Sequence, residues 1–91
     1  MVEFEWDETK DRTNQRKHGI SFALAASVFL DGDRKERLDE RSVDEERWIT
    51  IGLVDEREMV VAYTMRGEAI RLISARGADR YEREDYWNRE V

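Results

Sequence analysis

The chain has 91 residues, of which 40% are hydrophobic and 42% are charged, and its formal net charge is −6. A chain of this length can form one hydrophobic core of modest size. The absence of cysteine excludes disulfides, thiolate metal sites and a cysteine nucleophile. A single histidine excludes a multi-histidine metal site, and no apolar run approaches the roughly 20 residues of a membrane helix. We therefore expect a cytoplasmic protein with no cofactor, no metal and no membrane partner.

The negative charge is concentrated in the middle of the sequence. Residues 21–64 contain 6 Lys/Arg and 11 Asp/Glu, whereas residues 65–91 contain 6 of each. Because affinity for phosphates comes from neutralising them, a net-acidic chain is a poor general binder of polyanions, which argues against a DNA-coating role. A small, locally basic site is compatible with this charge, since 13 of the 16 basic residues are arginines, which suit bidentate phosphate contacts.

The first twenty residues predict a short strand followed by a polar helix. Residues 1–6 alternate between apolar and acidic side chains, as a strand does. Asp7 is a suitable N-cap for a helix over residues 8–17, and Gly19 suits its C-terminal end. This helix has no large apolar side chain, so we expect it to be held by apolar residues at its two ends. Those residues are Trp6 and Ile20.

A core helix and a series of strands follow. Ser21 is the expected N-cap of a helix to about residue 30, in which apolar side chains recur at helical spacing. Residues 31–46 hold eight acidic and four basic side chains, which predicts an exposed strand over 34–38 and a solvated loop, or else a surface for a basic partner. Three strand-like runs and a closing helix cover residues 47–54, 58–65, 68–76 and 78–89.

The order of these elements is β-α-α-β-β-β-β-α. Short connections between the last strands predict hairpins, and therefore an antiparallel sheet of four to five strands. Two N-terminal helices and one C-terminal helix are expected to pack on this sheet. The sequence thus predicts one α+β domain over residues 1–91.

The polar residues of the last predicted hairpin lie at its two opposite ends, which we call its poles. With a turn at Arg66-Gly67, Met65 pairs near Glu68 and Arg57 falls near Arg76. Arg66 and Glu68 then lie at the turn, and Arg71 lies further in along the strand. Arg76 lies roughly 26 Å from Glu68, because eight strand residues separate the two.

The closing helix starts at the pole opposite the turn. Its length of some 15–18 Å is expected to bring Tyr86, Trp87 and Arg89 back over the turn. A carboxylate among arginines beneath aromatic rings suits metal-free RNA cleavage, in which glutamate takes the 2′-hydroxyl proton and arginine neutralises the phosphorane. At helical spacing one stripe cannot bury Tyr81, Tyr86 and Trp87 together, so at least one ring is expected to meet solvent, a ligand or a partner.

These residues also have plain structural interpretations. Arg66 and Glu68 fit an exposed hairpin tip with a surface ion pair worth under about 1 kcal/mol. Arg76 fits an arginine that bonds to the last helix or to the preceding turn. His18 is the one side chain that titrates near neutral pH unaided, and so a candidate acid or base, but a histidine in the last turn of a helix is also stabilised by the helix dipole.

A third polar set lies on the first helix. Lys10, Asn14 and Lys17 share one face of that helix at spacings of four and three residues. The face suits a ligand, and it equally suits a solvated surface, because the helix has no large apolar side chain to bury.

Several stretches, taken in order, resemble the signatures of one family. The opening set is Phe4-Glu5-Trp6-Asp7, Lys10, Asn14, Lys17-His18-Gly19-Ile20 and Phe22. The middle set is Asp39 to Ser42, Glu45-Glu46-Arg47, Tyr63-Thr64 and Arg66-Gly67. The closing set is Ile70-Arg71-Leu72-Ile73-Ser74-Ala75-Arg76, Ala78, Glu82-Arg83 and Tyr86. Together they resemble the BrnT toxins, the DUF497 family.

The resemblance implies a fold like that of the RelE toxins and the toxin role in a bacterial type II toxin–antitoxin pair. It implies metal-independent endoribonuclease activity that arrests translation. It also implies neutralisation by a BrnA-like antitoxin with its own DNA-binding domain, so that operator DNA is reached only through the complex. A homo- or hetero-oligomer is compatible with such a role.

The chain departs from the family pattern at two positions and in its charge. Arg41 stands where relatives usually carry histidine, Met65 stands where an acidic residue is frequent, and the net charge of −6 is unusually negative for such a toxin. The alternative function is therefore a non-catalytic module that docks an antitoxin-type partner. A small DNA-binding regulator is a third reading, which the negative charge disfavours.

The residues and the resemblance together predict the site. The catalytic residues are predicted to be His18, Arg66, Glu68, Arg71 and Arg76. The RNA-binding residues are predicted to be Lys10, Lys17, Arg80, Arg83, Tyr86 and Trp87. Replacing Arg66 or Glu68 by alanine is expected to abolish growth arrest.

Overall fold

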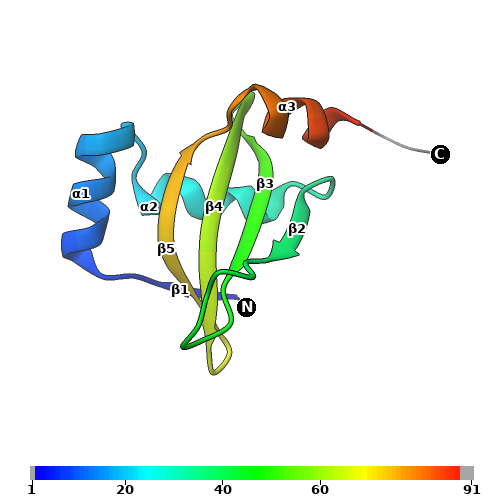
Figure 1. Ribbon diagram of the computed structural model, residues 1–91. Helices are drawn as coiled ribbons and strands as arrows, with labels where there is room; N and C mark the ends of the chain where they lie inside the picture. The colour runs from blue at the N-terminus through cyan, green and yellow to red at the C-terminus, as the bar shows by residue number, and fades with distance from the viewer. Residues whose placement is uncertain (1, 89–91) are drawn as a thin grey trace.

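The computed structural model describes residues 2–88 and contains a five-stranded sheet with helices around it (Figure 1). The elements are β1 (Glu3–Glu5), α1 (Glu8–His18), α2 (Phe22–Ala25), the 3₁₀ helix η1 (Ala26–Leu30), β2 (Lys35–Leu38), β3 (Trp48–Val54), β4 (Arg57–Arg66), β5 (Ala69–Gly77) and α3 (Arg80–Trp87). The predicted α+β class and element order are confirmed. The likeness to the RelE toxins stays a prediction.

The sheet is not antiparallel throughout. Its strand order is β1-β5-β4-β3-β2, and the four strands from β2 to β5 form an antiparallel meander. β1 instead pairs parallel to β5, with Glu5 opposite Arg71. β5, the last strand of the meander, lies beside β1 and runs in the same direction, so the two strands pair in parallel. It places the start of α1 next to the last strand.

The two ends of α1 are built as the sequence predicts. The Asp7 carboxylate accepts hydrogen bonds from the backbone N–H groups of Thr9 and Lys10 at 2.8 and 3.1 Å. Gly19, at a φ of 70°, donates its N–H to the Gln15 carbonyl and closes the helix. Ile20 is fully buried, and Trp6 packs against the same core.

α1 is also fixed along its length, by buried polar side chains that the sequence reading did not anticipate. Asn14 donates from Nδ2 to the Ala75 carbonyl at 2.8 Å and to the Ile20 carbonyl at 2.9 Å, and it accepts the Ala75 N–H at 3.1 Å. β1 pairs with β5 only as far as Arg71, so among residues 2–88 no strand neighbours the edge of β5 beyond it. Asn14 thus takes the place of a strand partner at Ala75.

Apolar side chains fill both faces of the sheet. Between the sheet and the α2–η1 segment lies the main core, which includes Phe22, Val28, Val61 and Leu72. A smaller cluster on the opposite face joins Tyr86 of α3 to β3 and β4. We call that opposite face the α3 face.

The predicted register of the β4–β5 hairpin is wrong. Arg66 pairs with Ala69, so the two-residue turn is Gly67-Glu68, with Gly67 at a φ of 60°. Further along, a bulge between Ala62 and Tyr63 shifts the pairing again. Val60 therefore lies opposite Arg76, three residues from the expected partner Arg57.

The predicted position of the closing aromatic residues is also wrong. α3 begins beside the end of β5, as expected, but it lies across that end of the sheet and does not return toward the turn (Figure 1). Tyr86 is 1% exposed and donates its hydroxyl proton to Asp31. The Trp87 indole donates to Glu58, at the opposite end of β4 from Arg66, at 2.8 Å. Arg89 lies outside the described residues.

The direction of α3 follows from the contacts that its residues make with the sheet. Tyr86 packs on the apolar patch of Ile49, Ile51 and Val60. The Lys35 ammonium of β2 donates to the carbonyls of Asp85 and Asn88, which satisfies the end of the helix. As expected for three rings that cannot share one stripe, Tyr81 and Trp87 are 80% and 54% exposed.

Candidate functional site

A cleft of about 240 Å³ lies between α1 and β5, and we call it the α1–β5 cleft. Its lining includes the basic side chains Lys10, Lys17 and His18, which all come from α1, and it includes no carboxylate. β5 contributes Ser74 and Ile73, and the remaining lining residues are neutral. The sequence-predicted residues Lys10, Lys17 and His18 are therefore brought together, on a chain whose net charge is −6.

Helical spacing and a single anchor explain this arrangement. Lys10 and Lys17 are seven residues apart, which places them on one face of α1. Asn14 lies midway between them on the same face, and its hydrogen bonds to Ala75 hold that face against β5. His18 follows in the last helical turn, where the helix dipole favours positive charge. Asn14 thus positions the basic side chains and need not itself bind a ligand.

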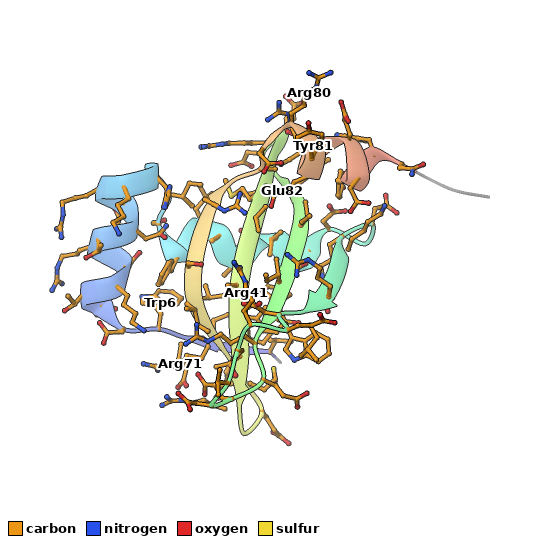
Figure 2. All side chains as sticks on the ribbon, viewed as in Figure 1. Trp6, Arg41, Arg71, Arg80, Tyr81 and Glu82 are labelled. Carbon is orange, nitrogen blue, oxygen red and sulfur yellow. The ribbon has the colours of Figure 1, made fainter. Side chains whose placement is uncertain are left out.

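Arg71 lies at the junction of β1 and β5, two residues before the lining residue Ile73 and below Trp6 in Figure 2. Its guanidinium lies 3.5 Å from the carboxylate of Glu5, directly across the parallel strand pair. Hydrogen bonds from the N–H groups of Lys10 and Thr9 lower the pKa of Asp7, and the positive charges of Lys10 and Arg71 lower it further. The field of Arg71 therefore reaches the start of α1.

Further arginines share the α3 face by strand alternation. Arg37 of β2 lies in one row across the sheet with Ile49, Ala62 and Ser74. Ala62 and Ser74 have small side chains, and they occupy the β4 and β5 positions of this row. Figure 2 shows Arg41 in front of β4, on the loop that follows β2. The sequence reading missed Ser74 as a lining residue of the cleft, because its position beside α1 depends on how the helix packs on the sheet.

The turn end of the hairpin holds part of the predicted catalytic set. Arg66 and Arg71 lie on the α3 face near this end, because Arg66 pairs with Ala69, two residues before Arg71. Glu68 lies in the turn and is exposed. Within residues 2–88 neither Arg66 nor Glu68 takes part in a salt bridge, so the surface pair envisaged between them is not formed. The structure does not bring Tyr86 or Trp87 to this end.

Arg76 bonds to the last helix, as its structural interpretation predicts. Its Nη1 and Nη2 donate to the two carboxylate oxygens of Glu82 in α3, both at 2.7 Å. These hydrogen bonds raise the pKa of Arg76 above its ordinary value and lower the pKa of Glu82 below its own. Glu82 also accepts the N–H of Asp79 as half of a capping box. Arg76 therefore ties β5 to the start of α3.

The other residues predicted to bind RNA lie on α3. Arg80 forms an ion pair with Glu84 at 3.2 Å, and Arg83 donates to the Ala78 carbonyl at 2.8 Å. Both are exposed at the surface of the helix. Tyr86 is too deeply buried to stack on a base, so its predicted role is wrong.

The described residues offer no prepared metal site and no membrane helix. Nowhere in residues 2–88 do three His, Asp or Glu side chains form a group able to hold a metal ion. No helix in that range is long and apolar enough to cross a membrane.

These observations define a small α+β protein with a basic cleft on a net-acidic chain. Residues 6–82 match the family of ribonuclease toxins, BrnT, of type II toxin–antitoxin systems, and the chain belongs to that family. A comparison with curated proteins found no match. The family resemblance noted in the sequence is thus confirmed, and with it the broad role of a ribonuclease toxin that has RNA as substrate and an antitoxin as partner.

Proposed function

We propose that this chain is an endoribonuclease that cleaves RNA in the α1–β5 cleft without a metal ion. Its activity arrests translation in the cytoplasm until a cognate antitoxin neutralises it. The observation that carries the proposal is the sign of the charge in the cleft. Lys10, Lys17 and His18 line it and no carboxylate does, although acidic residues outnumber basic ones by 22 to 16 in the chain.

The lysines hold the phosphate that is cleaved. Two ammonium groups on one face of α1 neutralise a phosphodiester, and Arg71 on β5, two residues before the lining residue Ile73, neutralises the next phosphate along the strand. α1 fixes the backbone positions of the two lysines and the Glu5–Arg71 pair orients Arg71, so these cations stabilise the additional negative charge of the phosphorane.

His18 moves the proton. It accepts the proton of the ribose 2′-hydroxyl while the 2′ oxygen attacks phosphorus, and it returns that proton to the departing 5′ oxygen. One P–O bond forms and one breaks, which leaves a 2′,3′-cyclic phosphate and a free 5′-hydroxyl. The reaction consumes no water and requires no metal. Histidine suits this task because it is the side chain that exchanges protons most readily between pH 5 and 8.

The turn end of the hairpin is a second candidate for the chemistry. Arg66 and Arg71 share the α3 face there, and Glu68 is an exposed carboxylate free of any salt bridge within the described part of the chain. In that arrangement Glu68 takes the 2′-hydroxyl proton and returns it to the departing 5′ oxygen as the P–O5′ bond breaks, while the arginines stabilise the phosphorane. Arg80, Arg83 and Trp87 would then contact a longer RNA at the other end of the sheet.

A purified sample tests the reaction directly. We expect the chain to cleave single-stranded RNA in the presence of excess EDTA and to leave the same oligonucleotide intact when its riboses carry 2′-O-methyl groups. The products should be a cyclic phosphate and a 5′-hydroxyl, identified by mass spectrometry. Cleavage that EDTA abolishes would contradict the metal-free mechanism.

The absence of any cleavage would favour the alternative, a toxin-like module that only docks its partner. The departures from the family pattern at Arg41 and Met65 are the observations that favour this alternative. We further propose that the antitoxin is BrnA-like and carries the DNA-binding domain. Operator DNA is then bound by the complex, because the net-acidic chain is a poor DNA ligand by itself.

A further inference from the structure

The β-bulge of the last hairpin lies in β5, at the wall of the α1–β5 cleft. Consecutive residues of β4 pair with Leu72 and Ser74, so Ile73 between them has no partner on β4. Leu72 and Ala75 both face the main core, although regular alternation places residues three apart on opposite faces of a sheet. The extra residue Ile73 therefore reverses the side to which the next side chain points. Without the bulge, Ser74 would face the main core together with Leu72.

The bulge turns the Ser74 side chain toward the α1–β5 cleft. Ile73 and Ser74 both line that cleft, whereas consecutive residues of a regular strand point to opposite faces. Ser74 is exposed, and within residues 2–88 its hydroxyl takes part in no hydrogen bond. Bulges beside active sites commonly direct one side chain in this way. The fold thus presents an unoccupied hydroxyl to the cleft.

The two other hydroxyls that line the cleft are already engaged. Those of Thr9 and Thr13 accept hydrogen bonds from Arg12 and Arg16 of the same helix, at 3.4 and 3.2 Å. Of the lining hydroxyls, that of Ser74 is the one without a partner among the described residues. It is therefore the hydroxyl that a ligand in the cleft can bind without displacing another group.

The backbone at Ser74 is held from both edges of β5. On one edge Ser74 pairs with β4, and on the other edge Asn14 bonds to the N–H and the carbonyl of the next residue, Ala75, at 3.1 and 2.8 Å. Asn14 also anchors the face of α1 that carries the two lysines. The backbone positions of Ser74 and of the lysines are therefore fixed relative to one another, on opposite walls of the cleft.

We propose that Ser74 is a further catalytic residue, whose hydroxyl donates a hydrogen bond to a non-bridging oxygen of the phosphate that is cleaved. This inference rests on the proposed function, which supplies the phosphate in the cleft and the proton transfer by His18. The lysines contact the phosphate from the α1 wall, and Ser74 contacts it from the β5 wall. Ser74 keeps its own proton, so the bonds that form and break are those already described.

The hydrogen bond from Ser74 acts mainly in the transition state. A hydroxyl donor binds an oxygen more strongly as the negative charge on that oxygen increases. The phosphorane carries more negative charge than the bound phosphodiester, so the bond lowers the barrier more than it raises affinity. Affinity itself depends on the ammonium groups, because it comes from neutralising phosphate charge.

Three variants test this role. Ser74→Ala removes the hydroxyl and Ser74→Thr retains one on a side chain that suits a strand. Ser27→Ala is the matched control, because Ser27 lies in η1 and does not line the cleft. For each variant the measurements are the single-turnover rate on a short RNA, the affinity for its 2′-O-methyl form and the melting temperature.

We expect Ser74→Ala to slow cleavage about 10- to 100-fold, the range of a lost hydrogen bond to a charged group, with nearly unchanged affinity and melting temperature. Ser74→Thr should retain most of the rate, and Ser27→Ala all of it. A rate for Ser74→Ala equal to that of the unchanged chain would overturn the inference and leave the proposed function standing. Absence of cleavage by the unchanged chain would contradict the proposed function and this inference with it.

A phosphorothioate at the cleaved linkage distinguishes contact with the phosphate from a structural role. Sulfur accepts hydrogen bonds weakly, so the unchanged chain should cleave more slowly the diastereomer that places sulfur opposite Ser74. The difference in rate between the two diastereomers should shrink in Ser74→Ala and persist in Ser27→Ala. An equal difference in the two variants would show that Ser74 does not contact the phosphate.

Discussion

Replacing His18 by alanine is expected to lower the rate of RNA cleavage by about 10²–10⁴-fold, the range typical of a lost general acid–base. The residual activity should lose most of its dependence on pH between 5 and 8, because the proposed reaction uses a histidine as its acid and base. Single-turnover cleavage of a short RNA across this pH range provides the measurement. His18 is exposed, so the melting temperature should change little.

Arg66→Ala and Glu68→Ala are the comparison for this experiment. Both residues are exposed at the turn end of the hairpin, outside the α1–β5 cleft. We expect each to slow cleavage far less than His18→Ala does. If Arg66→Ala and Glu68→Ala instead abolish cleavage and growth arrest while His18→Ala retains both, the chemistry lies at the turn end.

The largest effect on stability is expected for Asn14. Asn14→Ala would leave the Ala75 N–H and the carbonyls of Ala75 and Ile20 without their partners, in a buried place. At about 1 kcal/mol or more for each lost bond, we expect a loss of about 2–4 kcal/mol. A chain of this size then melts roughly 10–25 °C lower, which differential scanning calorimetry measures directly.

Two further variants separate the hydrogen bonds of Asn14 from a general effect of altering α1. Gln15→Ala changes an exposed neighbour on the same helix and should melt close to the unchanged chain. Asn14→Asp keeps the size and the acceptor but loses both Nδ2 hydrogen bonds, so it should also be destabilised. If Asn14→Ala and Gln15→Ala melt together, the strand-like role of Asn14 is refuted.

The parts of the fold that depend on neighbouring residues were predictable from the sequence. Asp7 and Gly19 mark the ends of α1 because capping is a local interaction, and both act as expected. The α+β class follows from the order of such elements. The gathering of Lys10 and Lys17 on one face needed only helical spacing.

The remainder depends on contacts between segments far apart in the sequence. The pairing of Glu5 with Arg71 requires β1 to join the sheet beside β5, which no local pattern encodes. The burial of Asn14 depends on an open strand edge at Ala75. The turn lies one residue later than predicted and the strands contain a bulge, so the register of the hairpin differs from the predicted one. Tyr86 packs on an apolar patch of β3 and β4, and it therefore lies away from the turn.

The central claim is that the basic face of α1 holds the RNA phosphate, and a comparison of two double variants tests it most directly. Lys10→Ala/Lys17→Ala removes two charges from the α1–β5 cleft, and Arg12→Ala/Arg16→Ala removes two from the rest of the same helix. With a 2′-O-methyl RNA that resists cleavage, affinity is measured by fluorescence anisotropy at several salt concentrations. We predict that only the lysine variant binds weakly and that its salt slope falls by about 0.7 for each lost phosphate contact. Equal affinities and equal slopes for the two variants would contradict the account.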